Sequence, residues 1–61
     1  MYRIAEVETI YSPTNRSYWD AEKEVTEYAN KLAKSKGFTA FAVRSTKVYG
    51  RNWNISIYCN D

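Results

Sequence analysis

The sequence contains no histidine and a single cysteine, Cys59. A disulfide within one chain needs two cysteines, and structural zinc sites draw their ligands mainly from cysteine and histidine. We therefore expect no disulfide, no metal and no cofactor. Cys59 belongs to an alternating apolar segment, so we interpret it as a packed thiol rather than a reactive one. A short chain without these supports must be stabilised by its core or by a partner.

Glycine and proline are also scarce, with two residues and one residue, and no apolar run is long. The two glycines, Gly37 and Gly50, are too few for a glycine-rich phosphate-binding loop. No segment approaches the ~20 apolar residues of a membrane span, and the N-terminus lacks the apolar run of a signal peptide. We expect a cytoplasmic protein that does not associate with membranes.

The net charge is small, because nine lysines and arginines stand against seven aspartates and glutamates. A balance of +2 does not by itself indicate a polyanionic partner. The 61 residues predict one domain, residues 1–61, which buries only roughly 60% of the surface of its unfolded chain. A deep catalytic cleft is not expected at this size. Aromatic side chains are abundant: six tyrosines, two tryptophans and two phenylalanines.

The most strongly specified segment is residues 17–36, which predict an amphipathic helix. Ser17 and Asp20 have the spacing of an N-cap and its N3 residue, and Gly37 suits the left-handed residue that ends a helix. One face carries an apolar stripe, made of Tyr18, Ala21, Val25, Tyr28, Ala29 and Leu32. Trp19 lies outside this stripe and is therefore a candidate for binding a partner.

Three further segments predict strands, over residues 2–10, 38–47 and 51–60. The last segment alternates most clearly, with one apolar face made of Trp53, Ile55, Ile57 and Cys59. In the first strand we place Ala5 and Val7 on the core side, because unpaired glutamates are costly to bury. The opposite side then carries Ile4, Glu6, Glu8 and Ile10.

A three-residue loop over residues 48–50 is expected to join the last two strands, with Gly50 in the left-handed position. Counting from that loop sets a register: Lys47 opposite Arg51, Ser45 opposite Trp53, Val43 opposite Ile55, Phe41 opposite Ile57, and Thr39 opposite Cys59. The resulting fold class is α+β, a two-layer β-α-β-β domain. Its three-stranded antiparallel sheet has the order 1-3-2, and the helix packs on one face.

The sheet face that the helix leaves open is the candidate interaction surface. We expect it to carry small and polar residues with few aromatics: Ala40, Ala42, Arg44, Thr46, Asn54, Ser56 and Tyr58, with Ile4, Glu6 and Glu8 from the first strand. Glu6 and Glu8 are interpreted as solvated strand residues rather than a catalytic pair, because no histidine or metal site accompanies them. The predicted partner-binding residues are Arg44, Lys47, Tyr49, Arg51, Tyr58 and Trp19.

These features favour a small non-enzymatic module that binds a protein, such as a phage or mobile-element inhibitor of a host enzyme or defence complex. One alternative is a nucleic-acid-binding protein that uses the basic and aromatic hairpin around Tyr49 and Arg51. A second alternative is a structural homo-oligomer, for example a homodimer through the open sheet face. The β-α-β-β layout resembles that of dodecin-type small oligomers, which bury this face between subunits, and the resemblance concerns layout alone.

Overall fold

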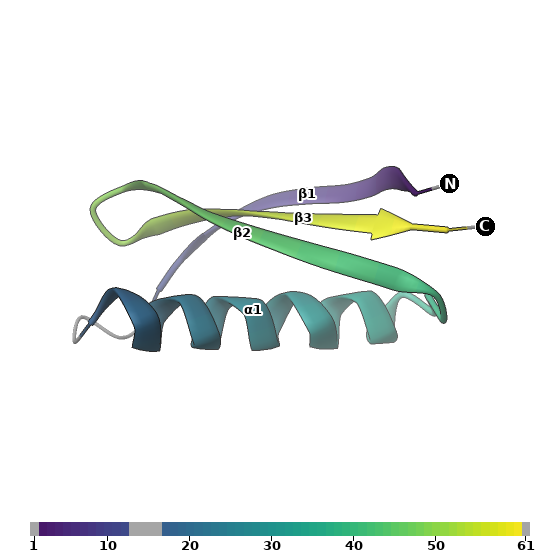
Figure 1. The fold of residues 1–61 in the computed structure, drawn as a ribbon, viewed down its shortest axis with the longest axis horizontal. Helices are drawn as coiled ribbons and strands as arrows, with labels where there is room; N and C mark the ends of the chain where they lie inside the picture. Colours follow the sequence, from purple (N-terminus) through teal and green to yellow (C-terminus); the bar gives the residue numbers. More distant parts are fainter. Residues whose placement is uncertain (1, 13–16, 61) are drawn as a thin grey trace.

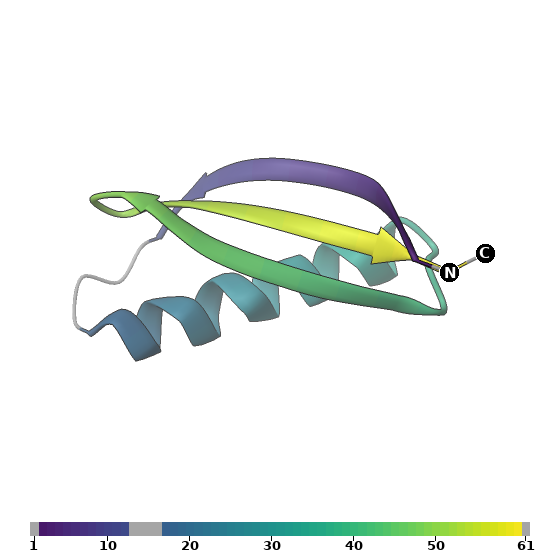
Figure 2. The same ribbon diagram turned by 45° about the horizontal axis from the view of Figure 1, so that its top comes forward.

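The computed structural model describes residues 2–12 and 17–60. Its elements, in chain order, are β1 (Arg3–Tyr11), α1 (Tyr18–Ser35), β2 (Phe41–Tyr49) and β3 (Asn52–Cys59). The strands form one antiparallel sheet in the order β1-β3-β2, and α1 runs along one face of it (Figure 1). Figure 2 shows β3 between the two outer strands. The α+β class, the β-α-β-β order and the strand order 1-3-2 are thereby confirmed.

Both ends of α1 follow the local signals in the sequence. The Ser17 hydroxyl accepts a hydrogen bond from the Asp20 backbone N–H at 3.1 Å, which makes Ser17 the N-cap. At the other end, Gly37 has a φ of 87°. The Phe38 N–H donates to the Ala33 carbonyl and the Gly37 N–H to the Lys34 carbonyl, the pair of bonds that defines a Schellman motif.

The core lies between the centre of the sheet and a stripe of small residues on α1. The apolar side of β3 is buried as predicted, and Trp53 is only 1% exposed. The buried helix residues are Ala21, Val25, Ala29 and Ala33. Tyr18 and Tyr28, which the sequence places in the buried stripe, stay exposed at its two flanks instead. Three of the four buried helix residues are alanines, so the helix backbone can lie close to the sheet.

The predicted orientation of β1 holds for Ile4 but is wrong from Glu6 onward, because this strand contains a β-bulge. Ile4 pairs with Tyr58 and Glu6 pairs with Ile57, so Ala5 is the extra residue on β1. A single extra residue reverses the alternation of every residue before it relative to those after it. Strict alternation would put Ile4 on the same side of the strand as Glu6 and Glu8. The bulge places Ile4 on the opposite side from the two glutamates.

As a result, Ile4 and Val7 both lie on the open face, where they are 56% and 57% exposed. Glu6, Glu8 and Ile10 pair with the buried residues of β3 and therefore face the helix layer. The carboxylates that were expected on the open face are thus absent from it.

The two glutamates are tolerated on the helix side because each has a partner on α1 or at its end. The Lys36 ammonium lies 3.2 Å from a Glu6 carboxylate oxygen, and the Tyr28 hydroxyl donates to the Glu8 carboxylate at 2.7 Å. β1 is an edge strand, and α1 packs mainly against β2 and β3. Glu6 and Glu8 therefore remain partly exposed, and the desolvation penalty that argued against this placement is small.

The predicted hairpin register is also wrong, by two residues. A two-residue turn joins β2 and β3, and Gly50, with a φ of 60°, takes its first position, as in a type II′ turn. A bulge follows Lys47, and Val48 is its extra, unpaired residue. Lys47 therefore lies opposite Trp53 rather than Arg51, and the expected like-charge pair does not exist. The Cα partners along the hairpin are Phe41 with Cys59, Val43 with Ile57, Ser45 with Ile55, and Lys47 with Trp53.

Candidate functional site

The open sheet face is built from four cross-strand rows, each with one residue from every strand. Residues that pair in an antiparallel sheet point to the same side, so the polar alternation of β3 identifies the members on both neighbours. From the hairpin tip to the chain ends, the rows are Tyr11–Asn52–Tyr49, Thr9–Asn54–Thr46, Val7–Ser56–Arg44 and Ile4–Tyr58–Ala42. We call these twelve residues the open face.

The open face is apolar at one end, polar in the middle and aromatic at the tip. Ile4 and Val7 lie beside Tyr58 at the end near the termini. Tyr49 stands at the opposite end, where Tyr11 lies at the β1 edge and also lines the groove toward α1. Between them, the Thr9 hydroxyl donates to the Asn54 side-chain oxygen at 2.7 Å. Short polar side chains keep the central rows low, so a partner could approach the backbone closely there.

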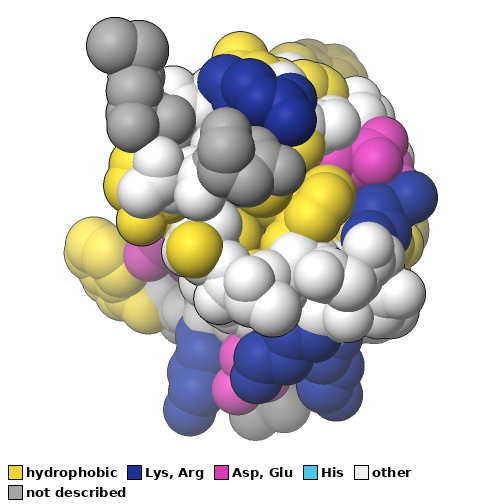
Figure 3. Space-filling view, turned by 90° about the vertical axis from the view of Figure 1, so that its right-hand side faces the viewer, with side chains coloured by type: hydrophobic (Ala, Val, Ile, Leu, Met, Phe, Trp, Pro, Cys, Tyr) yellow, Lys and Arg dark blue, Asp and Glu magenta, His cyan; other side chains and the backbone are white. Residues whose placement is uncertain are grey.

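Charge is distributed unequally between the two layers. Every carboxylate of the described residues lies on α1 or on the helix side of β1: Glu6, Glu8, Asp20, Glu22, Glu24 and Glu27. Figure 3, which looks onto the end where the termini lie, shows basic and acidic side chains together below, on the helix side. Arg44 is the one charged residue of the open face. The open face is therefore nearly neutral with a slight positive charge.

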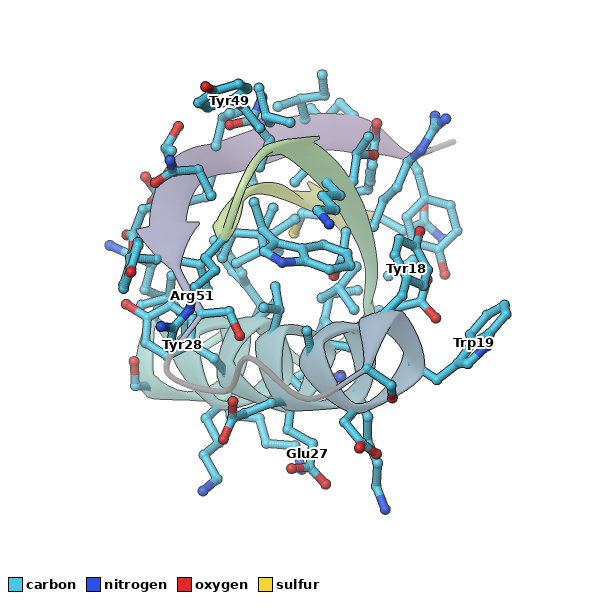
Figure 4. All side chains as sticks on the ribbon, turned by 90° about the vertical axis from the view of Figure 1, so that its left-hand side faces the viewer. Tyr18, Trp19, Glu27, Tyr28, Tyr49 and Arg51 are labelled. Atoms are coloured by element: carbon cyan, nitrogen blue, oxygen red, sulfur yellow. The ribbon has the colours of Figure 1, made fainter. Side chains whose placement is uncertain are left out.

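Three of the six predicted binding residues are brought together on this face. Arg44 lies in its third row, Tyr58 in the row nearest the termini, and Tyr49 at the tip. Tyr49 is 81% exposed. Figure 4 shows its ring standing on the side of the sheet away from the helix.

The other three predicted residues lie elsewhere. The Arg51 guanidinium stacks over the Tyr11 ring at 4.8 Å, and its Nε donates to the Ser12 carbonyl at 3.0 Å. Arg51 therefore supports the junction between β1 and the hairpin. Lys47 shares the helix-facing side with Trp53. Trp19 projects from the start of α1 beyond β2 (Figure 4).

Sequence reasoning placed Ile4 on the open face correctly but missed Val7 and Tyr11, although both are exposed. The signal that could have found them is the break in alternation at Ile4-Ala5, where two apolar neighbours precede two glutamates at alternate positions. A bulge accommodates such a break at the cost of one unpaired residue.

A groove lies between β1 and α1, on the side of the molecule where the helix does not cover the sheet. It has a volume of about 300 Å³ and is lined by Ile10, Tyr11, Glu24, Val25 and Tyr28. Its floor is apolar, and Glu24 and the Tyr28 hydroxyl provide polar groups. The groove exists because α1 packs under β2 and β3, which could not be inferred from the sequence.

The hydrogen bond from Tyr28 to Glu8 crosses from α1 to β1 beside this groove. It raises the pKa of Tyr28, and desolvation and the negative charge of Glu8 act in the same direction. Folding therefore favours the neutral phenol. This contribution to the stability of the folded state is fully present below the pKa of Tyr28 in the unfolded chain, near 10. It is lost as the pH rises through the higher pKa of Tyr28 in the folded state.

We predict that Tyr28→Phe removes this pH dependence. The difference in thermal unfolding midpoint between wild type and variant should be constant below about pH 10 and decrease above it. Circular dichroism melts over a pH series measure this difference directly. A difference that stays the same across the whole series would contradict the assignment.

No family model, curated protein or solved structure matches this chain. Among residues 2–12 and 17–60, no cluster of potential metal ligands is present. The helix in the described part of the chain is not apolar enough to cross a bilayer. The functional proposal therefore rests on the geometry of the surfaces.

Proposed function

We propose that the protein is a non-enzymatic module that binds a protein partner through the open face. The observation that carries this proposal is the uncovered sheet face, on which Ile4 and Val7 are more than half exposed and carboxylates are absent. Exposed aliphatic residues beside tyrosines and one arginine have the composition of protein-binding hot spots. A partner surface would bury these groups without leaving a negative charge unpaired.

The same charge distribution favours a protein over a nucleic acid. Proteins that bind a nucleic-acid backbone typically contact several phosphates through lysines and arginines, and each contact adds to the salt dependence of binding. The open face offers Arg44 alone, because Arg51 is engaged by Ser12 and Tyr11. Tyrosines could stack bases, but stacking without neutralised phosphates supports only weak binding.

The proposed inhibitor role follows from the same binding event. A small domain that covers part of a host enzyme or defence complex can block access to it without any chemistry of its own. This role makes the open face, rather than the helix, the surface that determines activity.

We predict that Val7→Glu abolishes capture of the partner. A carboxylate in the middle of an apolar interface costs about 2 kcal/mol or more, which corresponds to a roughly 30-fold weaker Kd. Tagged wild type and variant are incubated with an extract of the source cells after nuclease treatment, and the retained proteins are quantified by mass spectrometry. Lys31→Glu, which adds a carboxylate to the exposed outer face of α1, is the matched control and should retain capture.

The proposal fails if Val7→Glu retains the same proteins as wild type at the same level. It also fails if capture disappears after nuclease treatment and the purified protein binds single-stranded oligonucleotides with a steep dependence on salt. Once a partner has been captured and purified, calorimetry measures its Kd for wild type, Val7→Glu and Lys31→Glu. The ratio of these Kd values gives the size of the effect.

A further inference from the structure

The two edges of the sheet differ in how well they are protected against pairing with another strand. β1 carries a bulge at Ala5, and Glu6 and Glu8 turn charged side chains inward beside it. Bulges and inward-pointing charges are two devices by which natural sheets prevent edge-to-edge pairing. The β1 edge is thus unsuitable for accepting a strand.

The β2 edge lacks these devices over most of its length. Pairing with β3 is regular from Phe41 to Lys47, and the bulge comes only after that residue, at the hairpin tip. No proline interrupts β2, and Arg44 is its one charge before Lys47. Among the described residues β2 has a single strand neighbour, β3. Its outer backbone groups form a regular row that another strand can pair with.

An exposed tryptophan at the start of α1 lies on the same side of the molecule as this edge. Trp19 is 73% exposed, and its ring packs edge-to-face against Tyr18 with centroids 5.2 Å apart. Tyr18 in turn lies 5.2 Å from the Trp53 ring, which anchors it to the core. Figure 4 shows Trp19 extending past β2 on the helix side of the sheet. A large apolar ring that is exposed yet held in place by its neighbours is typical of an interface.

We infer that two copies of this chain pair through their β2 edges. The strands run antiparallel about a two-fold axis at Val43, which creates a continuous six-stranded sheet with both helices on one face. The pairing uses the backbone edge of β2 and leaves the open face uncovered in both copies, although Ala42 and Arg44 of that face meet across the seam. It therefore does not depend on the proposed protein partner.

The side chains of β2 select the register of this pairing. With the axis at Val43, the facing pairs are Val43 with Val43, Phe41 with Ser45, and Ala42 with Arg44. With the axis one residue later, Arg44 would face Arg44, and like charges directly opposite each other are destabilising. The Val43 register pairs residues 41–45 of one copy with the same residues of the other and places each arginine beside an alanine.

The helix layer fits the same arrangement. α1 packs under β2 and β3, and Thr26 on its β2 side shares a 3.0 Å hydrogen bond with Ser45. Strands are about 4.8 Å apart, so two helices placed under the β2–β3 boundaries are separated by roughly 10 Å, the upper end of the normal helix-packing distance. The helices run antiparallel, which brings the acidic start of one, including Glu22, toward the basic end of the other, including Lys34.

The first measurement is the mass in solution by light scattering over a concentration series. Wild type should reach twice the 7.2 kDa mass of the chain. Ala42→Lys should weaken the dimer about tenfold, because it places two lysines opposite the two Arg44 residues. Ala42→Glu should leave the dimer at least as stable, because it replaces those repulsions by ion pairs. Residue 42 is exposed, so circular dichroism should show both variants folded.

The second measurement is oxidative cross-linking. In the Val43 register, the two copies of residue 43 are direct neighbours at a Cα distance that allows a disulfide. Val43→Cys should therefore form a covalent dimer rapidly. Thr46→Cys is the matched control, because its two copies lie roughly 20 Å apart along the strands. Wild type, whose Cys59 is buried, should not cross-link.

A wild-type protein that remains at 7.2 kDa at the highest concentration reached would overturn the inference. So would a dimer that Val7→Glu dissociates and Ala42→Lys does not, because the copies would then meet through the open face. Equal cross-linking of the residue 43 and residue 46 variants would overturn the register. A dimer that survives Val7→Glu while extract proteins are lost would support both proposals separately.

Discussion

Replacing Trp53 by alanine is expected to leave the domain largely unfolded at room temperature. Trp53 is 1% exposed and is the largest buried side chain in the core. Removal of a buried aromatic side chain costs about 3–5 kcal/mol. At about 0.05–0.15 kcal/mol per residue, a 61-residue domain has about 3–9 kcal/mol in total. The loss is thus comparable to the whole stability.

The matched control is Trp19→Ala, the same substitution at an exposed position of the same protein. It should change the free energy of unfolding by about 0.5 kcal/mol or less, measured at a protein concentration where the chain is monomeric. Urea titrations followed by far-UV circular dichroism measure both variants. Similar losses at the two positions would contradict the burial that the structure assigns to Trp53.

The second large effect is expected from Ala29→Leu. Ala29 is fully buried in the small-residue stripe of α1, against the sheet. A larger side chain at this position must push α1 away from β3 or displace Val25 and Ile55 from their packed positions. Overpacking of this kind costs about 1–3 kcal/mol and occasionally more, although leucine is a good helix former.

Glu27→Leu is the control for this substitution, because it introduces the same side chain on the outer side of α1, where Glu27 points away from the sheet (Figure 4). Its effect should stay within about 0.5 kcal/mol. If Ala29→Leu proved as stable as wild type in urea titrations, the close approach of α1 to the sheet would be wrong.

The open face and the β2 edge together describe a protein with two kinds of contact. The open face is proposed to bind a foreign protein, and the edge is proposed to bind a second copy of the chain. Both proposals follow from the thin two-layer architecture, in which one helix covers one face of three strands. A domain of this size has few residues to spare for covering its own surface.

The candidate site was only partly visible in the sequence. Arg44, Tyr49 and Tyr58 were identified because each lies in a strand or turn whose facing could be counted from a strong local pattern. The contacts of Arg51 with Ser12 and Tyr11 were not foreseen, since they join segments about forty positions apart in the chain. Contacts over such separations leave no periodic signal, so no reading of local pattern could assign them.

The sequence by itself determined the elements whose information is local. The Ser17 cap, the Gly37 stop, the period of α1 and the alternation of β3 each depend on neighbours within a few positions, and these specify conformation directly. The order of the strands followed from the strand directions that the helix connection and the hairpin set, and from the preference for an antiparallel sheet.

Only the tertiary structure decided the facing of β1 and the register of the hairpin. One bulge at Ala5 sends Glu6 and Glu8 to Lys36 and Tyr28. A two-residue turn at Gly50 together with a second bulge after Lys47 shifts the hairpin pairing by two residues. A bulge costs little locally and is selected by partners far away in the chain, so its position is fixed by packing. Because β1 is an edge strand that α1 barely covers, carboxylates could turn inward, and the open face was left without them.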